Sequence, residues 1–489
     1  MLVHELIFNG DANKVAIIDG KQRILYRELQ EKVSKYRNYL YNCGIRAGEN
    51  VGLFSRNSPE YIYAYMALAG LGAVVVPINF QLSMREVSYI AKNAQMRFMI
   101  TCQPLTLSTD VVVNQLFMSD INEMLVGQSM PDAPKLPQSF SDEENCVIIY
   151  TSGTTGSPKG AVLSHKNLTS NASMFSDAIG IMAIDNVLCI LPMYHCFAWT
   201  CAVLNPLLSG ATIVILDTFS PKETTNVIKK ENISLIYAVP SICNVLTRHA
   251  DPEDMVSVRC VVVGGTMLPL KVAQDFIAHF GINIVEGYGL SEASPVVAVN
   301  PPQRVKNGSI GKPLPELTVR IVDEQDQPVP NGQIGEIIVQ GDSIMKGYFN
   351  LPEDTVKALR NGWLHTGDLA YQDEEGYIFI VDRLKDMIIS MGENIYPREI
   401  EEVLYHYPGV QEAAVVGIPD KLRGQAGIAF VVMGQDNEKP NKREIKEYLQ
   451  NNLALYKVPR EINFYDKLPK SSTGKILKQE LVKMKLQEC

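Results

Sequence analysis

The chain has 489 residues, with 45 Lys and Arg against 54 Asp and Glu and a formal net charge of −9. This length predicts roughly two to four hydrophobic cores, and the acidic balance argues against nucleic acid or an anionic membrane surface as a partner. Nine cysteines without a Cys-x-x-Cys pair argue against a zinc site and a disulfide framework, and the start at Met1 has no cationic leader, so we expect a protein of the reducing cytoplasm.

In the first three hundred residues or so, short apolar runs alternate with helix-periodic segments. Helices are expected at 29–43, 59–69 and 83–93 with β-branched runs between them, and the same rhythm returns from 211 to 265. This alternation predicts parallel strands covered by helices on both faces.

Two long stretches without charged residues, 61–84 and 186–216, invite comparison with membrane helices. Glycine and proline interrupt both stretches, whereas a spanning helix needs about twenty consecutive apolar residues. We therefore expect buried strands and helices here and no transmembrane segment.

In the remainder of the chain, the pattern of apolar, glycine and proline residues changes twice. The runs 336–341 and 377–382 have the pattern of antiparallel strands between Gly- and Pro-rich turns. After Lys385, helices are expected at 397–405 and 442–452. The predicted fold class is α/β: a large body of βα units, an attached β-rich portion, and a small α+β C-terminal domain of about a hundred residues.

The stretch YTSGTTGSPKG (150–160) follows the apolar run 146–149 and is a candidate phosphate-binding loop. A strand followed by a Gly/Ser/Thr turn exposes backbone N–H groups, and the hydroxyls add donors, so that together they form an anion nest. The spacing is not that of the P-loop, because Gly153 and Gly156 are three apart and Lys159 precedes a glycine. A flexible surface loop is an equally good interpretation of this stretch taken alone.

The stretch EGYGLSEASP (286–295) has the chemistry of a nucleotide site. Its Gly-Tyr-Gly turn would let Tyr288 stack on an adenine, and Ser291 and Glu292 offer a hydroxyl and a hard oxygen ligand for phosphate and Mg²⁺. A tight turn with a core tyrosine is the alternative.

Three shorter stretches add charged candidates. In WLHTGDLA (363–370) Asp368 could accept from both ribose hydroxyls, and in VDRLKDMI (381–388) Arg383 could donate to the same sugar. PKSSTGKIL (469–477) places Lys475 on a glycine-flanked turn. Solvated turn residues are the alternative for each one taken alone.

Together and in this order, these stretches resemble the adenylate-forming superfamily of acyl- and aryl-CoA synthetases, luciferases and peptide-synthetase adenylation domains. The resemblance runs from about residue 20 to 480, and EGYGLSEASP with GENIYPREIEEVLY (392–405) looks most like bacterial fatty acid–CoA ligases. It implies a large N-terminal domain with a barrel-like portion at 1–384 and a small mobile C-terminal domain at 385–489, with a hinge at Lys385.

The resemblance also implies a role for each matching residue. Phosphate binding falls to Thr151, Ser152, Gly153, Thr154, Thr155, Gly156 and Lys159. The rest of the ATP/AMP site would consist of Gly264, Gly265, Thr266, Glu286, Gly287, Tyr288, Gly289, Ser291, Asp368, Ile380, Arg383 and Lys475. Thr151 and Glu292 would hold Mg²⁺, and the implied catalytic set is Lys475, Thr151, Glu292 and His195.

The stretch LPMYHCFAW (191–199) lies where the family places part of its acyl pocket. His195 would stand near the substrate carboxylate and Trp199 would gate the acyl tunnel, while a structural histidine and a core tryptophan are the alternatives. The implied acyl pocket consists of His195, Trp199, Val239, Gly265, Gly289 and Pro295. The segments expected around it contain no Arg or Lys to meet a second carboxylate, which disfavours dicarboxylate substrates: 237–241, 263–268 and 289–297.

The predicted activity is an ATP-dependent acid–thiol ligation. A carboxylate attacks the α-phosphorus of ATP to give acyl-AMP and pyrophosphate, with Mg²⁺ assisting, and the thiol of coenzyme A then releases AMP. The resemblance to bacterial fatty acid–CoA ligases implies a medium- to long-chain fatty acid as the substrate. Thr266 stands where many aryl-acid ligases carry alanine, so a flat aromatic ring is expected to fit less well.

Several alternatives remain open. One is an aryl or aryl-propenoate acid–CoA ligase, and another is a stand-alone adenylation enzyme that loads a carrier protein. A non-enzymatic nucleotide-binding protein is disfavoured because Lys475, Glu292 and Asp368 are all present. The expected partners are the small-molecule acid and CoA, without nucleic acid, and a homodimer is one possible assembly.

Overall fold

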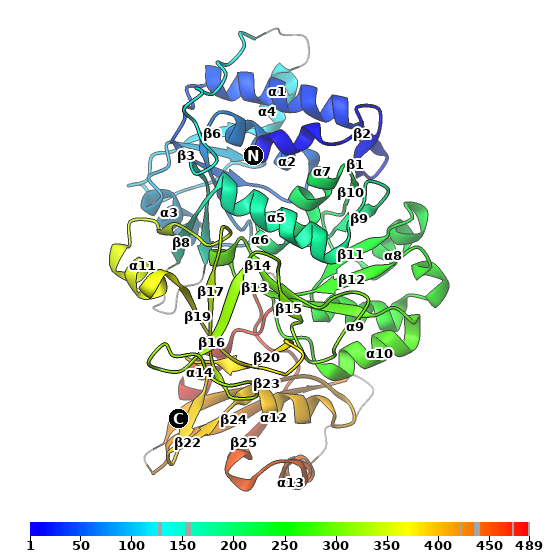
Figure 1. Cartoon of the computed structure of the whole chain (residues 1–489), viewed down its shortest axis with the longest axis vertical. Helices are drawn as coiled ribbons and strands as arrows, with labels where there is room; N and C mark the ends of the chain where they lie inside the picture. Colours follow the sequence, from blue (N-terminus) through cyan, green and yellow to red (C-terminus); the bar gives the residue numbers. More distant parts are fainter. Residues whose placement is uncertain (126–129, 152–157, 421, 435–440, 472–473, 488–489) are drawn as a thin grey trace.

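The computed structural model describes residues 1–125, 130–151, 158–420, 422–434, 441–471 and 474–487. The N-terminal helices lie at one end of the long axis of the molecule and the elements after residue 385 at the other, with the antiparallel strands of residues 318–383 between them (Figure 1). The α/β fold class, with a large N-terminal part and a smaller C-terminal part, is confirmed.

A nine-stranded sheet forms one half of the N-terminal body, in the order β15-β14-β13-β12-β11-β9-β10-β1-β2. Its interior pairs from β1 to β13 are parallel, as the alternation of strands and helices predicts. The strands are β1 Val15–Asp19, β2 Gln22–Leu25, β9 Asn186–Cys189, β10 Thr212–Ile215, β11 Leu235–Ala238, β12 Cys260–Val263, β13 Ile284–Gly289, β14 Val296–Val299 and β15 Lys312–Pro313.

A seven-stranded sheet forms the other half, in the order β18-β8-β7-β4-β3-β5-β6. The pairs from β7 to β6 are parallel, and β8 and β18 are added in antiparallel fashion. The strands are β3 Asn50–Phe54, β4 Val74–Pro77, β5 Phe98–Thr101, β6 Asn114–Phe117, β7 Asn145–Thr151, β8 Lys159–Ser164 and β18 Gly347–Tyr348.

Helices cover both sheets, and a single hydrophobic cluster that runs from Val3 to Ile378 joins them. Within this cluster, helix α2 begins at a Ser58 cap that accepts from Tyr61 N at 3.2 Å, and all of its residues except Glu60 are buried. The helices of the body are α1 Tyr26–Asn42, α2 Pro59–Gly70, α3 Met84–Asn93, α4 Met118–Met124, α5 His165–Ile179, α6 Cys196–Ala198, α7 Asn205–Ser209, α8 Pro221–Lys230, α9 Pro240–His249, α10 Leu270–Phe280 and α11 Pro352–Ala358.

Short helical turns link these elements. Trp199–Leu204 (η2) is a π-helical turn between α6 and α7, and the 3₁₀ turns are η1 Val3–Phe8, η3 Pro252–Met255, η4 Ser291–Ala293, η5 Arg360–Gly362 and η6 Leu455–Lys457. Among the described residues, no helix combines the length and the apolar character needed to cross a bilayer. The two uncharged stretches instead fold into α2 and β4, and into β9 to β10 with the helical turns between them.

The β-rich portion is a four-stranded antiparallel sheet in the order β16-β17-β19-β20. Its strands are β16 Thr318–Val322, β17 Gly335–Gln340, β19 Leu364–Gln372 and β20 Ile378–Arg383. A bridge between Gly311 and Ile378 joins it to the end of the nine-stranded sheet.

The C-terminal part is a five-stranded sheet in the order β22-β21-β24-β23, with β25 paired to β24. One hydrophobic cluster packs α12 and α13 on this sheet and another packs α14, so both faces have a core separate from that of the body. The elements are β21 Ile388–Ser390, β22 Glu393–Ile395, α12 Pro397–Tyr405, β23 Val410–Asp420, β24 Gly424–Met433, α13 Lys442–Asn452, β25 Glu461–Tyr465 and α14 Lys478–Gln487.

The junction at Gly311 generates a stability prediction. Gly311 has a φ of +83°, and a Cβ there would lie 2.1 Å from the backbone of Val299 and Asn300. Gly332 has a similar φ of +80° with nothing within 4 Å of its Cβ position. Gly311→Ala should therefore destabilise the body by about 3 kcal/mol or more, against about 1 kcal/mol of backbone strain for Gly332→Ala.

Urea unfolding followed by tryptophan fluorescence and circular dichroism would compare the two variants. Equal midpoints for Gly311→Ala and Gly332→Ala would show that the close approach at Gly311 is not rigid.

Candidate active site

Three strands bring Tyr288, Asp368 and Arg383 into direct contact. Asp368 and Arg383 are partners in the antiparallel pair β19–β20, and Arg383 Nε lies 3.1 Å from Asp368 Oδ1. Tyr288, on β13, donates its hydroxyl to Asp368 Oδ2 at 2.5 Å. The carboxylate is only 4% exposed, and burial raises the pKa of Tyr288 well above its usual value. The expected adenine and ribose residues therefore meet at one buried carboxylate.

Glycines beside this contact are required by close backbone packing. A Cβ at Gly264 would lie 3.3 Å from both the Gly287 carbonyl oxygen and Phe197 Cζ. A Cβ at Gly289 would lie 2.1 Å from the Pro295 carbonyl oxygen. The segments after β12 and at the end of β13 thus form one thin platform, the type of surface that a flat base can approach closely.

The edge of this platform carries Gly265, Thr266 and Glu286. Gly265 is exposed with a φ of +79°, and Thr266 is half-buried. Glu286 is buried, and its Oε1 accepts from Leu268 N at 3.2 Å. Burial raises the pKa of Glu286 to about 7.

A chain of polar contacts leads from Lys159 to Glu292. Lys159 Nζ lies 2.7 Å from Asp354 Oδ1 and 5.5 Å from the ring centroid of Tyr348. The Tyr348 hydroxyl donates to Glu292 Oε1 at 2.8 Å. Sequence reasoning missed Tyr348 and Asp354, whose signal is the stretch GYFNLPED (347–354), and only the antiparallel pairing of β18 with β8 reveals their position.

The two ends of the expected phosphate loop are paired across β7 and β8. Thr151 faces Lys159 in this pair, and its Oγ1 donates to the Lys159 carbonyl oxygen at 3.5 Å. The expected ligands Ser152, Gly153, Thr154, Thr155 and Gly156 lie outside the described residues, so their part in phosphate binding stays a prediction.

His195 and Cys196 lie at the start of α6, opposite Ser291. His195 Nδ1 accepts from Phe197 N at 3.2 Å and so caps the helix. Cys196 Sγ lies 3.3 Å from Ser291 Oγ, a contact that the sequence analysis did not anticipate. The expected α-phosphate hydroxyl of Ser291 is thus positioned by the residue that follows His195.

Lys475 reaches this site from the C-terminal part. A Cβ on Gly474 would lie 3.3 Å from Ser241 Oγ on α9, so the turn rests on the body. Burial, together with the positive charge of Arg383, lowers the pKa of Lys475 to about 8. Burial, together with the charge of Lys475, lowers the pKa of His195 to about 4. The two expected catalytic residues therefore lie within electrostatic range of each other.

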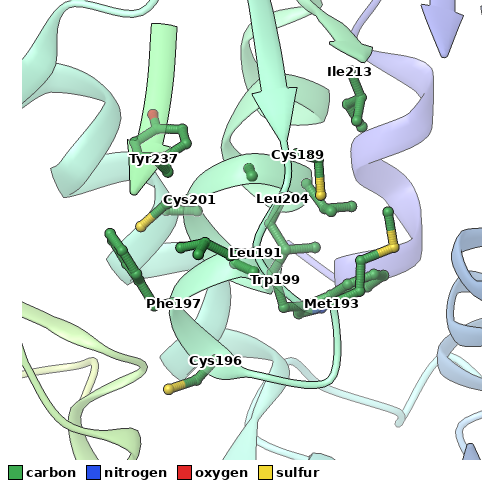
Figure 2. Packing of buried hydrophobic residues seen from close by; sticks show 14 of the residues in the cluster. Cys189, Leu191, Met193, Cys196, Phe197, Trp199, Cys201, Leu204, Ile213 and Tyr237 are labelled. Carbon is green, nitrogen blue, oxygen red and sulfur yellow. The ribbon is translucent and has the colours of Figure 1, made fainter. Parts of the chain in front are cut away.

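Trp199 lies farther from the nucleotide residues, in the packed interior. Its ring centroid is 4.0 Å from that of Tyr65 and 5.7 Å from that of Tyr61, both on α2, and it is 4% exposed. Nearer the site, Phe197 turns toward Tyr237, with ring centroids 6.1 Å apart (Figure 2). The wall on this side is apolar and largely aromatic.

The remaining residues that the sequence predicts for the site lie at its edges. Val239 is buried immediately before α9, and Pro295 is buried after η4. Ile380 is half-buried on β20, where its carbonyl oxygen accepts from the Arg398 guanidinium. Lys385 is exposed between β20 and β21, outside the contacts described above.

Two segments of the chain match known protein-family domains. Residues 7–349 match the AMP-binding enzyme family, and residues 399–475 match the AMP-binding enzyme C-terminal domain. The chain belongs to the AMP-binding enzymes. It is an adenylate-forming acid–CoA ligase, with ATP, a carboxylic acid and CoA as its substrates.

The individual relatives are named for different acid substrates. A feruloyl-CoA synthase from Amycolatopsis sp. is 36% identical over 95% of this chain and 95% of its own. A long-chain-fatty-acid–CoA ligase from Bacillus subtilis (strain 168) is 32% identical over 96% of this chain and 91% of its own. The crystal structure of ATP-bound MatB from Rhodopseudomonas palustris has a TM-score of 0.91 at 28% identity, covering 99% of both chains.

The lowered pKa of Lys475 predicts a pH dependence for this ligase. The ammonium form is present below about pH 8 and is lost as the pH rises through that value. If the charge serves acyl-AMP formation, kcat/KM for ATP in that half-reaction should fall by about tenfold per pH unit above pH 8. In Lys475→Arg the guanidinium stays charged, so this decline should vanish even if the absolute rate is lower.

Pyrophosphate exchange measured from about pH 6.5 to 9.5 would give both profiles. A decline that persists unchanged in Lys475→Arg would assign it to another group.

Proposed function

We propose that this ligase activates medium- to long-chain fatty acids and transfers them to CoA. The observation that carries this proposal is the aromatic lining beyond His195. It consists of the side chains of Phe197, Trp199 and Tyr237, all of which are buried. An acyl chain is stabilised by about 0.8 kcal/mol for each buried CH₂ group, and a second carboxylate would find no cation among 237–241, 263–268 and 289–297.

In the proposed nucleotide pose, the adenine lies on the platform of Gly264, Gly287 and Tyr288. The ribose hydroxyls approach Asp368, whose two carboxylate oxygens already accept from Tyr288 and Arg383. Because a carboxylate offers about four lone-pair positions, it can hold both ribose hydroxyls while it keeps these partners. This pose places the α-phosphate near the Ser291 hydroxyl.

Mg²⁺ fits the residues that the structure describes. Glu292 has one carboxylate oxygen held by Tyr348, and with Thr151 it would provide the protein ligands. Magnesium in nucleotide enzymes is typically bound by one or two carboxylates plus substrate phosphates, which agrees with the absence of a cluster of three ligating side chains among the described residues. When bound, the ion neutralises phosphate charge.

Lys475 and His195 would act on the carboxylate. The Lys475 ammonium neutralises charge that develops between the attacking carboxylate and the α-phosphate, in a buried position where such interactions are strong. With its low pKa, His195 is neutral near pH 7, and because Nδ1 accepts from Phe197 N, its proton is on Nε2. That N–H can donate to the carboxylate without repelling Lys475.

The leaving pyrophosphate would be held by loop 152–156 and by Lys159. In the structure Lys159 pairs with Asp354. Pyrophosphate carries more negative charge than one carboxylate, so the ammonium would exchange Asp354 for the nucleotide when ATP binds.

Trp199 determines which acids can enter. As packed on Tyr65, it closes the interior beyond Phe197, so a long chain requires the indole to move. A rigid Trp199 would instead leave room only for a short flat acid, and this favours an aryl-propenoate acid as the second candidate, in line with the feruloyl-CoA synthase relative.

A panel of acids separates these candidates. Carboxylate-dependent AMP release with CoA should rise with fatty-acid length from about six to sixteen carbons, because each added CH₂ contributes about 0.8 kcal/mol. Trp199→Ala should extend the accepted length or raise kcat/KM for the longest acids, with the buried Tyr61→Phe as a control. Activity confined to ferulate-like acids in both proteins would establish the aryl-propenoate function.

We also propose that the small domain at 385–489 rotates about Lys385 between the two half-reactions, so that one site serves adenylation and then thioester formation. Support comes from the separate cores on either side of this residue and from its exposed position. Lys385→Pro, which restricts φ, should slow thioester formation from supplied acyl-AMP more than acyl-AMP formation, by about tenfold or more.

Lys385→Ala, which removes the same side chain without restricting φ, is the matched control and separates the loss of the lysine charge from the loss of backbone freedom. Unchanged thioester formation in Lys385→Pro would place the hinge elsewhere.

A further inference from the structure

Helix α12 of the C-terminal part contacts the body at a place separate from the Lys475 turn. Its Glu402 accepts from Leu270 N at 3.4 Å through Oε2. Leu270 is the first residue of α10, a helix whose preceding residue, Pro269, makes no side-chain cap. A carboxylate from one domain thus caps a helix of the other, where the backbone N–H groups and the helix dipole favour negative charge.

Arg398 on the same helix lies next to this contact. It is 8% exposed, its backbone N–H donates to Asp382 Oδ2 at 2.9 Å, and its guanidinium donates to the Ile380 carbonyl oxygen. Its charge acts on both Glu402 and the buried Glu286 of the body, lowering the pKa of each against the larger effect of burial.

These contacts bear directly on the adenine platform. Glu286 begins the EGYG segment and accepts from Leu268 N, two residues before the N–H that Glu402 caps. Segment 264–270, which carries Gly264 and Gly265, is therefore held at its end by one carboxylate from each domain. When α12 leaves, Leu270 N loses its partner and Glu286 loses its compensating charge.

We propose that Glu402 and Arg398 form an interdomain latch, which selects the domain arrangement that makes acyl-AMP and fixes the adenine platform at the same time. Both are positioning residues, since neither is placed against the reacting atoms. This inference rests on the proposed rotation of the small domain, because a latch has a function only if the contact opens.

The chain offers a matched control on the same helix. Glu399 pairs with Lys457 at 2.7 Å, entirely within the C-terminal part. Glu399→Ala and Glu402→Ala therefore make the same change in α12, but only the second removes a contact with the body. Glu402→Gln keeps an oxygen that can accept from Leu270 N and removes the charge.

The test measures the half-reactions separately in the full chain. Loss of a charged helix cap typically costs about 1–2 kcal/mol, so Glu402→Ala should slow acyl-AMP formation by about five- to thirtyfold. Thioester formation from supplied acyl-AMP should stay within about twofold of wild type. The rate of acyl-AMP formation in Glu402→Gln should lie between those of wild type and Glu402→Ala. Glu399→Ala should leave the ratio of the two half-reaction rates unchanged.

Hydrogen–deuterium exchange provides a readout that needs no substrate. Amides in the first turn of α10 should exchange faster in Glu402→Ala than in wild type or Glu399→Ala, with the core strand β12 unchanged as evidence of folding. If no acid supports acyl-AMP formation in wild type, the proposed function fails while the exchange comparison still tests the latch. Equal slowing of both half-reactions, or unchanged exchange in α10, would overturn the latch.

Discussion

The buried Asp368 carboxylate is the interaction on which the site depends. It joins Tyr288, on β13 of the nine-stranded sheet, to Arg383, the last residue of β20 in the four-stranded sheet. Because β20 continues into the C-terminal part, the same ion pair fixes the direction in which the chain leaves the body. A carboxylate that is 4% exposed would be costly without these two partners, so the proposed nucleotide pocket and the domain junction are stabilised together.

The electrostatics of the site follow from the burial of cations. Burial, together with the positive charge of Arg383, lowers the pKa of Lys475 to about 8, and burial, together with the charge of Lys475, keeps His195 neutral. Such an arrangement is unfavourable by itself, and in the proposed nucleotide pose the negative charge between these groups would make it favourable. On that proposal, the domain arrangement that assembles the cations is coupled to the binding of the anion.

Much of the secondary structure could be predicted from the local sequence pattern. The helices expected at 59–69, 397–405 and 442–452 appear as α2, α12 and α13 with nearly the same bounds, because hydrophobic periodicity and capping residues act over a few neighbours. The contacts of Tyr348, Asp354, Cys196 and Arg398 were not accessible. Tyr348, Asp354 and Cys196 each depend on a partner more than fifty residues away, as in the pairing of β18 with β8 that carries Tyr348 to Glu292. Arg398, on α12, depends on the packing of that helix against β20 of the four-stranded sheet.

The sequence by itself determined the family, the order of the chemical groups, and the reaction class, because loops such as YTSGTTGSPKG and EGYGLSEASP contain the glycines and hydroxyls that nucleotide chemistry needs within a single short segment. Only the tertiary structure decided which of these groups meet. It brought Lys475 within electrostatic range of His195, set Trp199 against Tyr65, and brought Glu402 to the start of α10. Burial and charge proximity are properties of segments that lie far apart in the sequence and meet only through sheet register and domain packing.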